Sequence, residues 1–136
     1  MKVIFYKGME YGTVFDSLVC WWISGKYSHV ELVLGDFRYS SNPKEGVVKK
    51  PYDIDENEWD IIELDTSFPF SEVVAAEALL GCKYDHLGLF GFVFRPAMGK
   101  NSRWFCSEFV AHCLGFSDAW RYDPAILYSS LTYCKK

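Results

Sequence analysis

The sequence feature that most constrains the fold is a run from Trp104 to Gly115 that combines a cysteine with a helical pattern. Apolar residues recur at spacings of three and four after Cys106, which predicts an amphipathic helix that begins at this cysteine. Gly115 stands where such a helix would end in a left-handed cap. The thiol would therefore lie at a helix N-terminus, where free N–H groups and the helix dipole favour negative charge on sulfur. The alternative is that Cys106 is simply a small buried apolar residue.

A second segment, residues 28–34, has the alternating pattern of a half-buried β-strand. His29 and Glu31 would point to the same face, so an imidazole and a carboxylate would lie side by side. His29 is then the candidate general base for a cysteine nucleophile, and Glu31 could accept a hydrogen bond from its second ring nitrogen. Taken alone, the pair also fits a strand whose polar face points to water.

Together, Tyr27–Asp36 and Trp104–Val110 resemble the circularly permuted branch of the papain-like NlpC superfamily of cysteine hydrolases. The YiiX-like group, which includes small phage-encoded members, is the most similar. In ordinary members the cysteine helix precedes the histidine strand, whereas here His29 comes first and Cys106 follows. Lecithin retinol acyltransferase-like enzymes share this permuted order. Shorter matches are Ser24-Gly25, Glu45-Gly46-Val47-Val48 and Lys83-Tyr84-Asp85.

The resemblance implies a thiol peptidase or amidase that cleaves an amide bond in a peptide or a peptidoglycan stem peptide. Cys106 would form a thioester, His29 would move the proton, and neither a metal nor an organic cofactor would be needed. Two alternatives stay open. One is acyl transfer or thioester cleavage on a lipid acyl substrate, as in the acyltransferase relatives. The other is a non-catalytic binding or structural module of a phage virion on the same fold.

The residue that orients His29 is not fixed by the pattern. Family members often take it from the strand after the histidine strand, but here that strand carries neither a histidine nor a carboxylate. We favour Glu31, and the weaker candidates are Ser40, Ser41 and Asn42. The backbone N–H of Cys106 would hold the oxyanion. The second donor would be a hydroxyl such as that of Tyr6 or Tyr27.

The two other histidines are weaker candidates for the base. His112 would lie beside Glu108 on an exposed helix face, turned away from Cys106. His86 has no motif around it. Trp21 and Trp22 are expected to pack in the core, or else to form one wall of a substrate groove.

The length of 136 residues suits a single domain over residues 1–136. We expect an α+β fold, in which a small antiparallel sheet carries packed helices in a circularly permuted papain-like arrangement. The expected strands are 2–6, 28–34, 37–41, 47–49 and 58–64, and the expected helices are 13–24, 72–80, 86–93, 106–114 and 124–132. Residues 8–12 are expected to form a turn or loop, and residues 95–101 a loop; a strand is the alternative for 86–93.

Composition excludes several classes of function. The net charge is −4 and no dense block of basic residues occurs, so nucleic-acid binding is not indicated. No apolar run is long enough for a signal peptide or a membrane span. Five irregularly spaced cysteines without a Cys-x-x-Cys pair argue against a disulfide framework or a structural zinc site. We therefore expect a cytoplasmic protein, in the host cytoplasm or the virion if phage-encoded; nothing in the pattern indicates an oligomeric state.

Overall fold

The computed structural model describes residues 1–65, 70–85 and 103–133, and its strands and helices form a mixed α+β arrangement. In chain order the elements are β1 (Lys2–Tyr6), α1 (Gly8–Tyr11), α2 (Val14–Trp22), β2 (His29–Leu34), β3 (Phe37–Asn42), β4 (Gly46–Pro51), a 3-10 turn (Glu56–Glu58), β5 (Trp59–Glu63), α3 (Phe70–Ala78), β6 (Lys83–Tyr84), β7 (Arg103–Trp104), α5 (Cys106–Cys113), a second 3-10 turn (Ala119–Arg121) and α6 (Pro124–Tyr133).

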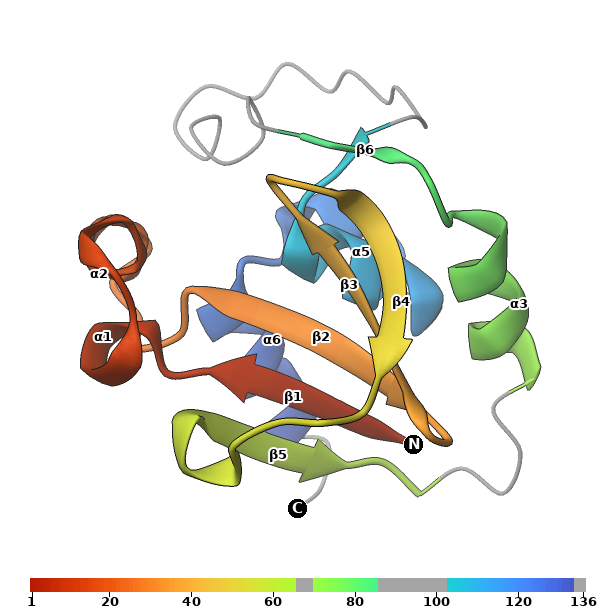
Figure 1. Cartoon of the computed structure of the whole chain (residues 1–136), viewed down its shortest axis with the longest axis horizontal. Helices are drawn as coiled ribbons and strands as arrows, with labels where there is room; N and C mark the ends of the chain where they lie inside the picture. The colour runs from red at the N-terminus through yellow and green to blue at the C-terminus, as the bar shows by residue number, and fades with distance from the viewer. Residues whose placement is uncertain (66–69, 86–102, 134–136) are drawn as a thin grey trace.

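A five-stranded antiparallel sheet forms the centre of the fold, in the order β4-β3-β2-β1-β5 (Figure 1). The middle strand is β2, so it is paired on both sides, by β1 and by β3. In the β1–β2 register, Tyr6 lies opposite His29 and Ile4 lies opposite Glu31. An edge strand leaves one side unpaired. The two polar residues of β2 therefore stand on an interior strand of the sheet, at the end where β2 is paired with β1 and not yet with β3.

The helices cover this sheet from one face and from its end (Figure 1). Helix α5 packs on β2 and β3, and it is flanked by α3 and α6. Phe109 and Val110 of α5 are fully buried against Val30 and Leu32 of β2, and Leu127 of α6 joins the same core. Helices α1 and α2 pack on each other beside the start of β2. The core thus lies between α5 and the middle of the sheet.

A short backbone contact joins β4 to the segment that leads into β6. The N–H of Val47 donates to the carbonyl of Cys82, and the N–H of Gly81 donates to the carbonyl of Val47, each over 2.9 Å. Gly46 precedes this contact with a φ of +73°, and a Cβ at this position would lie 2.2 Å from the Cys82 carbonyl oxygen. Only glycine fits such an approach, because the φ is left-handed and the space is filled.

Several elements follow their sequence signals. The five expected strands form the sheet, and Thr13 begins α2 with a capping box in which Asp16 is the reciprocal partner. The side chain of Asp123 accepts the N–H of Ile126 at the start of α6. Gly115 ends α5 with a φ of +76°, as a left-handed cap requires.

Other predictions were wrong. The expected loop at residues 8–12 is the short helix α1. Trp21 and Trp22, expected in the core, are exposed because α2 turns Val19 and Cys20 inward instead. The polar face of α5 is narrower than expected: His112 is exposed, but Ser107 and Ala111, expected on the same side, are fully buried. The helix and loop expected over residues 86–93 and 95–101 lie outside the described residues.

Within the described ranges, no helix is both long and apolar enough to cross a membrane.

Candidate active site

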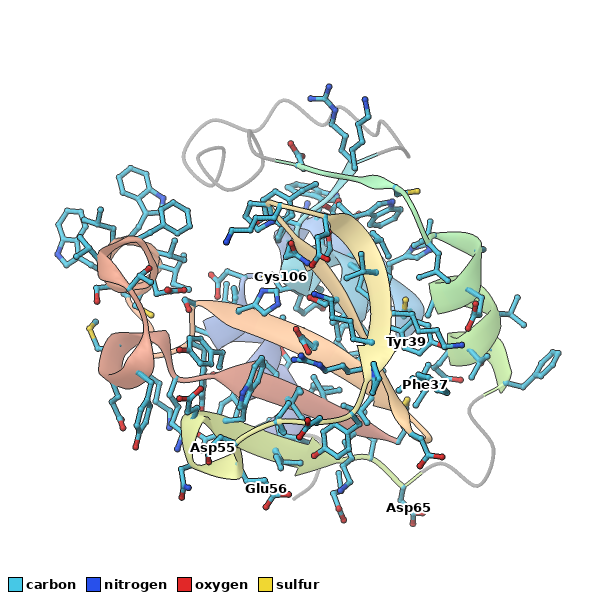
Figure 2. All side chains as sticks on the ribbon, in the orientation of Figure 1. Phe37, Tyr39, Asp55, Glu56, Asp65 and Cys106 are labelled. Carbon is cyan, nitrogen blue, oxygen red and sulfur yellow. The ribbon has the colours of Figure 1, made fainter. Side chains whose placement is uncertain are left out.

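Cys106 is the first residue of α5, and it faces the sheet. Phe105 before it is extended and caps the helix without a side-chain hydrogen bond, so the first backbone N–H groups of α5 are oriented around the thiol. Figure 2 shows Cys106 where α5 begins, over the strands on which the helix packs. The residue is 2 % exposed. The predicted position of the thiol, at a helix N-terminus, is therefore the observed one.

His29 opens β2, and its ring is held by two neighbours. Its Nε2 lies 3.2 Å from Oε1 of Glu31 and 3.0 Å from Oγ of Ser40 on the adjacent strand β3. The strand alternation correctly placed His29 and Glu31 on one face. The pair does not form an open polar face: Glu31 is buried, at 6 % exposure, and the side chain of His29 is 21 % exposed.

Glu31 is the centre of a buried polar chain. Its Oε2 accepts a hydrogen bond of 3.1 Å from Arg38, while its Oε1 faces His29. Burial alone would raise the pKa of Glu31, but the hydrogen bond and charge of His29 outweigh it, with the Arg38 charge and a hydrogen bond from Ser40 adding to the effect. The pKa of Glu31 is thus lowered, and the carboxylate stays ionised beside the imidazole.

The imidazole also meets the thiol. Burial by itself would lower the pKa of His29, but a hydrogen bond with Cys106 and the negative charge there raise it to about 10, together with the hydrogen bond and charge of Glu31. Because Nε2 faces Glu31 and Ser40, Nδ1 is the nitrogen left for the sulfur. The structure therefore brings together all three residues selected from the sequence: Cys106, His29 and Glu31.

The three other candidates for the group that orients His29 make different contacts. Ser40 contacts the imidazole together with Glu31, so the two share the position. Ser41 instead donates a 2.6 Å hydrogen bond to the carbonyl of Trp104. Asn42 accepts the N–H groups of Lys44 and Glu45 in the following turn. Ser41 thus ties β3 to the residues just before Cys106 and helps to set the position of the thiol.

Tyr84 is a neighbour of the thiol that sequence reasoning missed. It is buried on β6, where it pairs with Trp104 on β7. Burial raises the pKa of Tyr84, and the negative charges at Cys106 and Asp85 raise it further. Its phenol therefore keeps its proton near the sulfur. Trp59 borders the imidazole on another side, at 6.4 Å between ring centroids.

The two tyrosines expected as second oxyanion donors are bonded elsewhere. The hydroxyl of Tyr6 donates to the carbonyl of Tyr11 over 2.9 Å, and that of Tyr27 donates to Asp60 over 2.5 Å. Next to Cys106, Ser107 is fully buried, and its Oγ has no hydrogen-bond partner among the described residues. The hydroxyl of the residue next to Cys106 is thus unpaired among the described residues, whereas the two expected hydroxyls are bonded to other groups.

His112, the other histidine that the structure describes, is not part of the Cys106–His29–Glu31 site. His112 is exposed in the last turn of α5 and stacks on Trp104, with 4.7 Å between ring centroids. His86 lies outside the described residues. Over residues 1–65, 70–85 and 103–133, no three His, Cys, Asp or Glu side chains gather in a way that could hold a metal ion.

Comparisons with known proteins add no identification: no family model matches the chain, and no curated protein gives a significant match.

Proposed function

We propose that the protein is a cysteine hydrolase in which Cys106 is the nucleophile and His29 the acid–base group. One observation carries the proposal: Cys106, at the start of α5, interacts with the imidazole of His29, whose Nε2 faces Glu31 and Ser40. A histidine with a raised pKa holds its proton at neutral pH, and a neighbouring thiolate is the partner that favours this state. Glu31 and Ser40 orient the ring from its other nitrogen.

In the acylation step, the sulfur of Cys106 attacks the carbonyl carbon of the substrate and an S–C bond forms. The oxyanion accepts a hydrogen bond from the backbone N–H of Cys106 at the start of α5. The His29 imidazolium then gives its proton to the leaving amine, and the C–N bond breaks. The products of this step are a free amine and a thioester on Cys106.

In the deacylation step, neutral His29 takes a proton from water while the water oxygen attacks the thioester carbon. The S–C bond breaks and releases a carboxylic acid. The thiolate and the imidazolium are restored, so neither an oxidant nor a metal enters the cycle. The ion pair that Arg38 forms with Glu31 keeps the orienting carboxylate in place throughout.

We further propose the circularly permuted papain-like fold, because the base lies on the middle strand and the nucleophile on a later helix that packs across it. The substrate class we propose is an amide bond of a peptide or a peptidoglycan stem peptide. A reducing cytoplasm, which keeps thiols free, is the proposed compartment. The described cysteines Cys20, Cys82, Cys106 and Cys113 are all free thiols.

The first test compares the alkylation rates of individual cysteines with iodoacetamide at neutral pH, followed by peptide mass spectrometry. Cys106 should react at least about 10-fold faster than Cys82, although Cys82 is more exposed, because the thiolate is the reacting form. His29→Ala should remove this advantage. The exposed His112→Ala is the matched control and should leave the rate unchanged. Equal rates at the two cysteines, or an unchanged rate in His29→Ala, would exclude the proposed pair.

The second test addresses the substrate. Wild-type protein and Cys106→Ala are incubated with soluble peptidoglycan fragments and with a peptide library, and new amino and carboxyl termini are identified by mass spectrometry. Cleavage by the wild-type protein alone supports the amide substrate. A fatty acyl group trapped on Cys106 from a lipid donor, without amide cleavage, would replace this substrate class by the lipid one.

A further inference from the structure

Helix α2 presents an apolar face to the outside of the molecule. Val19 and Cys20 point inward and are buried. Five large apolar side chains on the other side are between 48 and 81 % exposed: Val14, Phe15, Leu18, Trp21 and Trp22. Met9 and Tyr11 of the neighbouring α1 are about half exposed as well. Isolated exposed apolar residues are common, but a contiguous set of this size marks an interaction site.

The five residues of α2 are arranged symmetrically about Leu18. Val14 and Phe15 precede it by four and three positions, and Trp21 and Trp22 follow it by three and four. If a second copy of α2 packs antiparallel with a two-fold axis at Leu18, each position meets its counterpart: 14 meets 22, and 15 meets 21. The smallest side chain, Val14, is then opposite a tryptophan, which gives the two surfaces complementary sizes.

The charge of the helix favours a protein partner over a lipid surface. Asp16 is the only charged residue of α2, and its carboxylate is already bonded to Thr13 and to Ser28. Helices that lie on anionic membranes usually carry Lys and Arg on their polar face, and α2 has neither. The centres of protein interfaces are rich in Trp, Tyr, Phe and Met and poor in charge, which is the composition of this face.

The exposed area is sufficient for a stable complex. Aromatic side chains offer about 150–250 Å² each, so Tyr11, Phe15, Trp21 and Trp22 at about half to two-thirds exposure leave roughly 400 Å² uncovered. Met9, Val14 and Leu18 add to this area. The total approaches the roughly 800 Å² that each partner contributes to a standard interface.

We propose that the protein forms a two-fold symmetric dimer through α2, with Leu18 on the axis and each Trp21–Trp22 pair seated on Val14 and Phe15 of the second copy. This proposal does not depend on the proposed catalysis, because none of these side chains takes part in it. The dimer would place the two proposed active sites near the interface, because Asp16 of α2 accepts a hydrogen bond from Ser28, the residue just before His29.

The test measures association by analytical ultracentrifugation of the full chain over a wide concentration range. We expect a wild-type dimer with a Kd on the order of 1 μM or tighter. Leu18→Lys places two like charges at the axis and should weaken the dimer at least about 100-fold. Val74→Lys is the matched control, since Val74 is a helix residue of similar exposure, at 51 %, on α3. A monomer at every concentration, or a dimer that Leu18→Lys leaves intact, would overturn the proposal.

A crosslinking experiment keeps the proposal testable if Leu18→Lys fails to fold. A cysteine at the axis meets its own copy, so Leu18→Cys should form an intermolecular disulfide on mild oxidation, whereas Val74→Cys should not. Equal crosslinking of the two variants would contradict the dimer. The same samples are floated with neutral phosphatidylcholine vesicles. Co-flotation of wild-type monomers that is lost in Leu18→Lys would show that a lipid surface, and not a second copy, covers α2.

Discussion

The pKa of His29 can be measured directly, because the chain contains only three histidines and an NMR titration can resolve them. Burial opposes the charged ring, and the hydrogen bond and charge of Cys106, followed by those of Glu31, raise the pKa of His29 to about 10. Removing either partner should therefore lower this pKa. We therefore expect a lower pKa of His29 in both Cys106→Ser and Glu31→Gln.

The size of the effect in Glu31→Gln follows from the geometry. Unit charges at the 3.2 Å that separate His29 Nε2 from Glu31 Oε1 interact by about 5 kcal/mol at an effective dielectric constant of about 20, and by about 1 kcal/mol in bulk water. The side chains are 21 and 8 % exposed, so the interaction lies between these limits. Since about 1.4 kcal/mol corresponds to one unit, we expect the pKa of His29 to fall by about 1–3 units.

The assay follows the Cε1 signal of each histidine in ¹³C-labelled protein across neutral and alkaline pH. Glu45→Gln is the matched control, because this exposed carboxylate bonds Lys50 and does not contact the imidazole; it should leave the titration of His29 unchanged. A wild-type His29 that titrates near the usual value of about 6.5, with no response to Cys106→Ser, would refute the reasoning and with it the proposed nucleophile–base pair.

Four further predictions concern stability, measured as the free energy of unfolding in urea. Gly115→Ala should lower the free energy of unfolding by about 1 kcal/mol. The left-handed φ is unfavourable for alanine, but the added Cβ meets no other atom. Gly46→Ala has nearly the same φ but meets the Cys82 carbonyl, so it should cost about 3 kcal/mol, and equal losses would contradict the clash. Thr13→Ala removes the cap of α2 and should cost about 1 kcal/mol; no loss would argue against the capping box. Acidification should remove the stability that ionised Glu31 contributes. Because the pKa of Glu31 is lower in the folded protein than in the unfolded chain, this contribution is fully present above about pH 4.5. It is lost as the pH falls through the pKa of Glu31 in the folded protein. A Glu31→Gln variant should lack this part of the acid dependence, and an unchanged pH profile would argue against it.

The sequence could predict those parts of the site that depend on periodicity. His29 and Glu31 share a face because strand side chains alternate, and Cys106 begins a helix because apolar spacing and Gly115 define both ends. The choice between Ser40 and its neighbours could not be made in this way. It depends on how two strands are shifted against each other, and a shift of one residue turns every side chain to the opposite face.

The rest of the site depends on tertiary contacts that leave no local pattern. Tyr84 lies on a strand of only two residues, which is too short to show any alternation. The orientation of α2 was also wrong at Trp21 and Trp22, because both sides of that helix carry apolar residues and composition does not say which side turns inward. The burial of Ser107 on α5 could not be predicted either, because it results from the position of this residue between the sheet and other helices.

The order of the elements has a consequence for synthesis. A ribosome releases the central strand β2, with its imidazole, long before it releases α5, with its sulfur. Until α5 is made, the growing polypeptide carries the proposed base, His29, without the proposed nucleophile, Cys106. In the proposed mechanism, the nucleophile–base pair is therefore complete only after α5 has been made and has packed on the sheet.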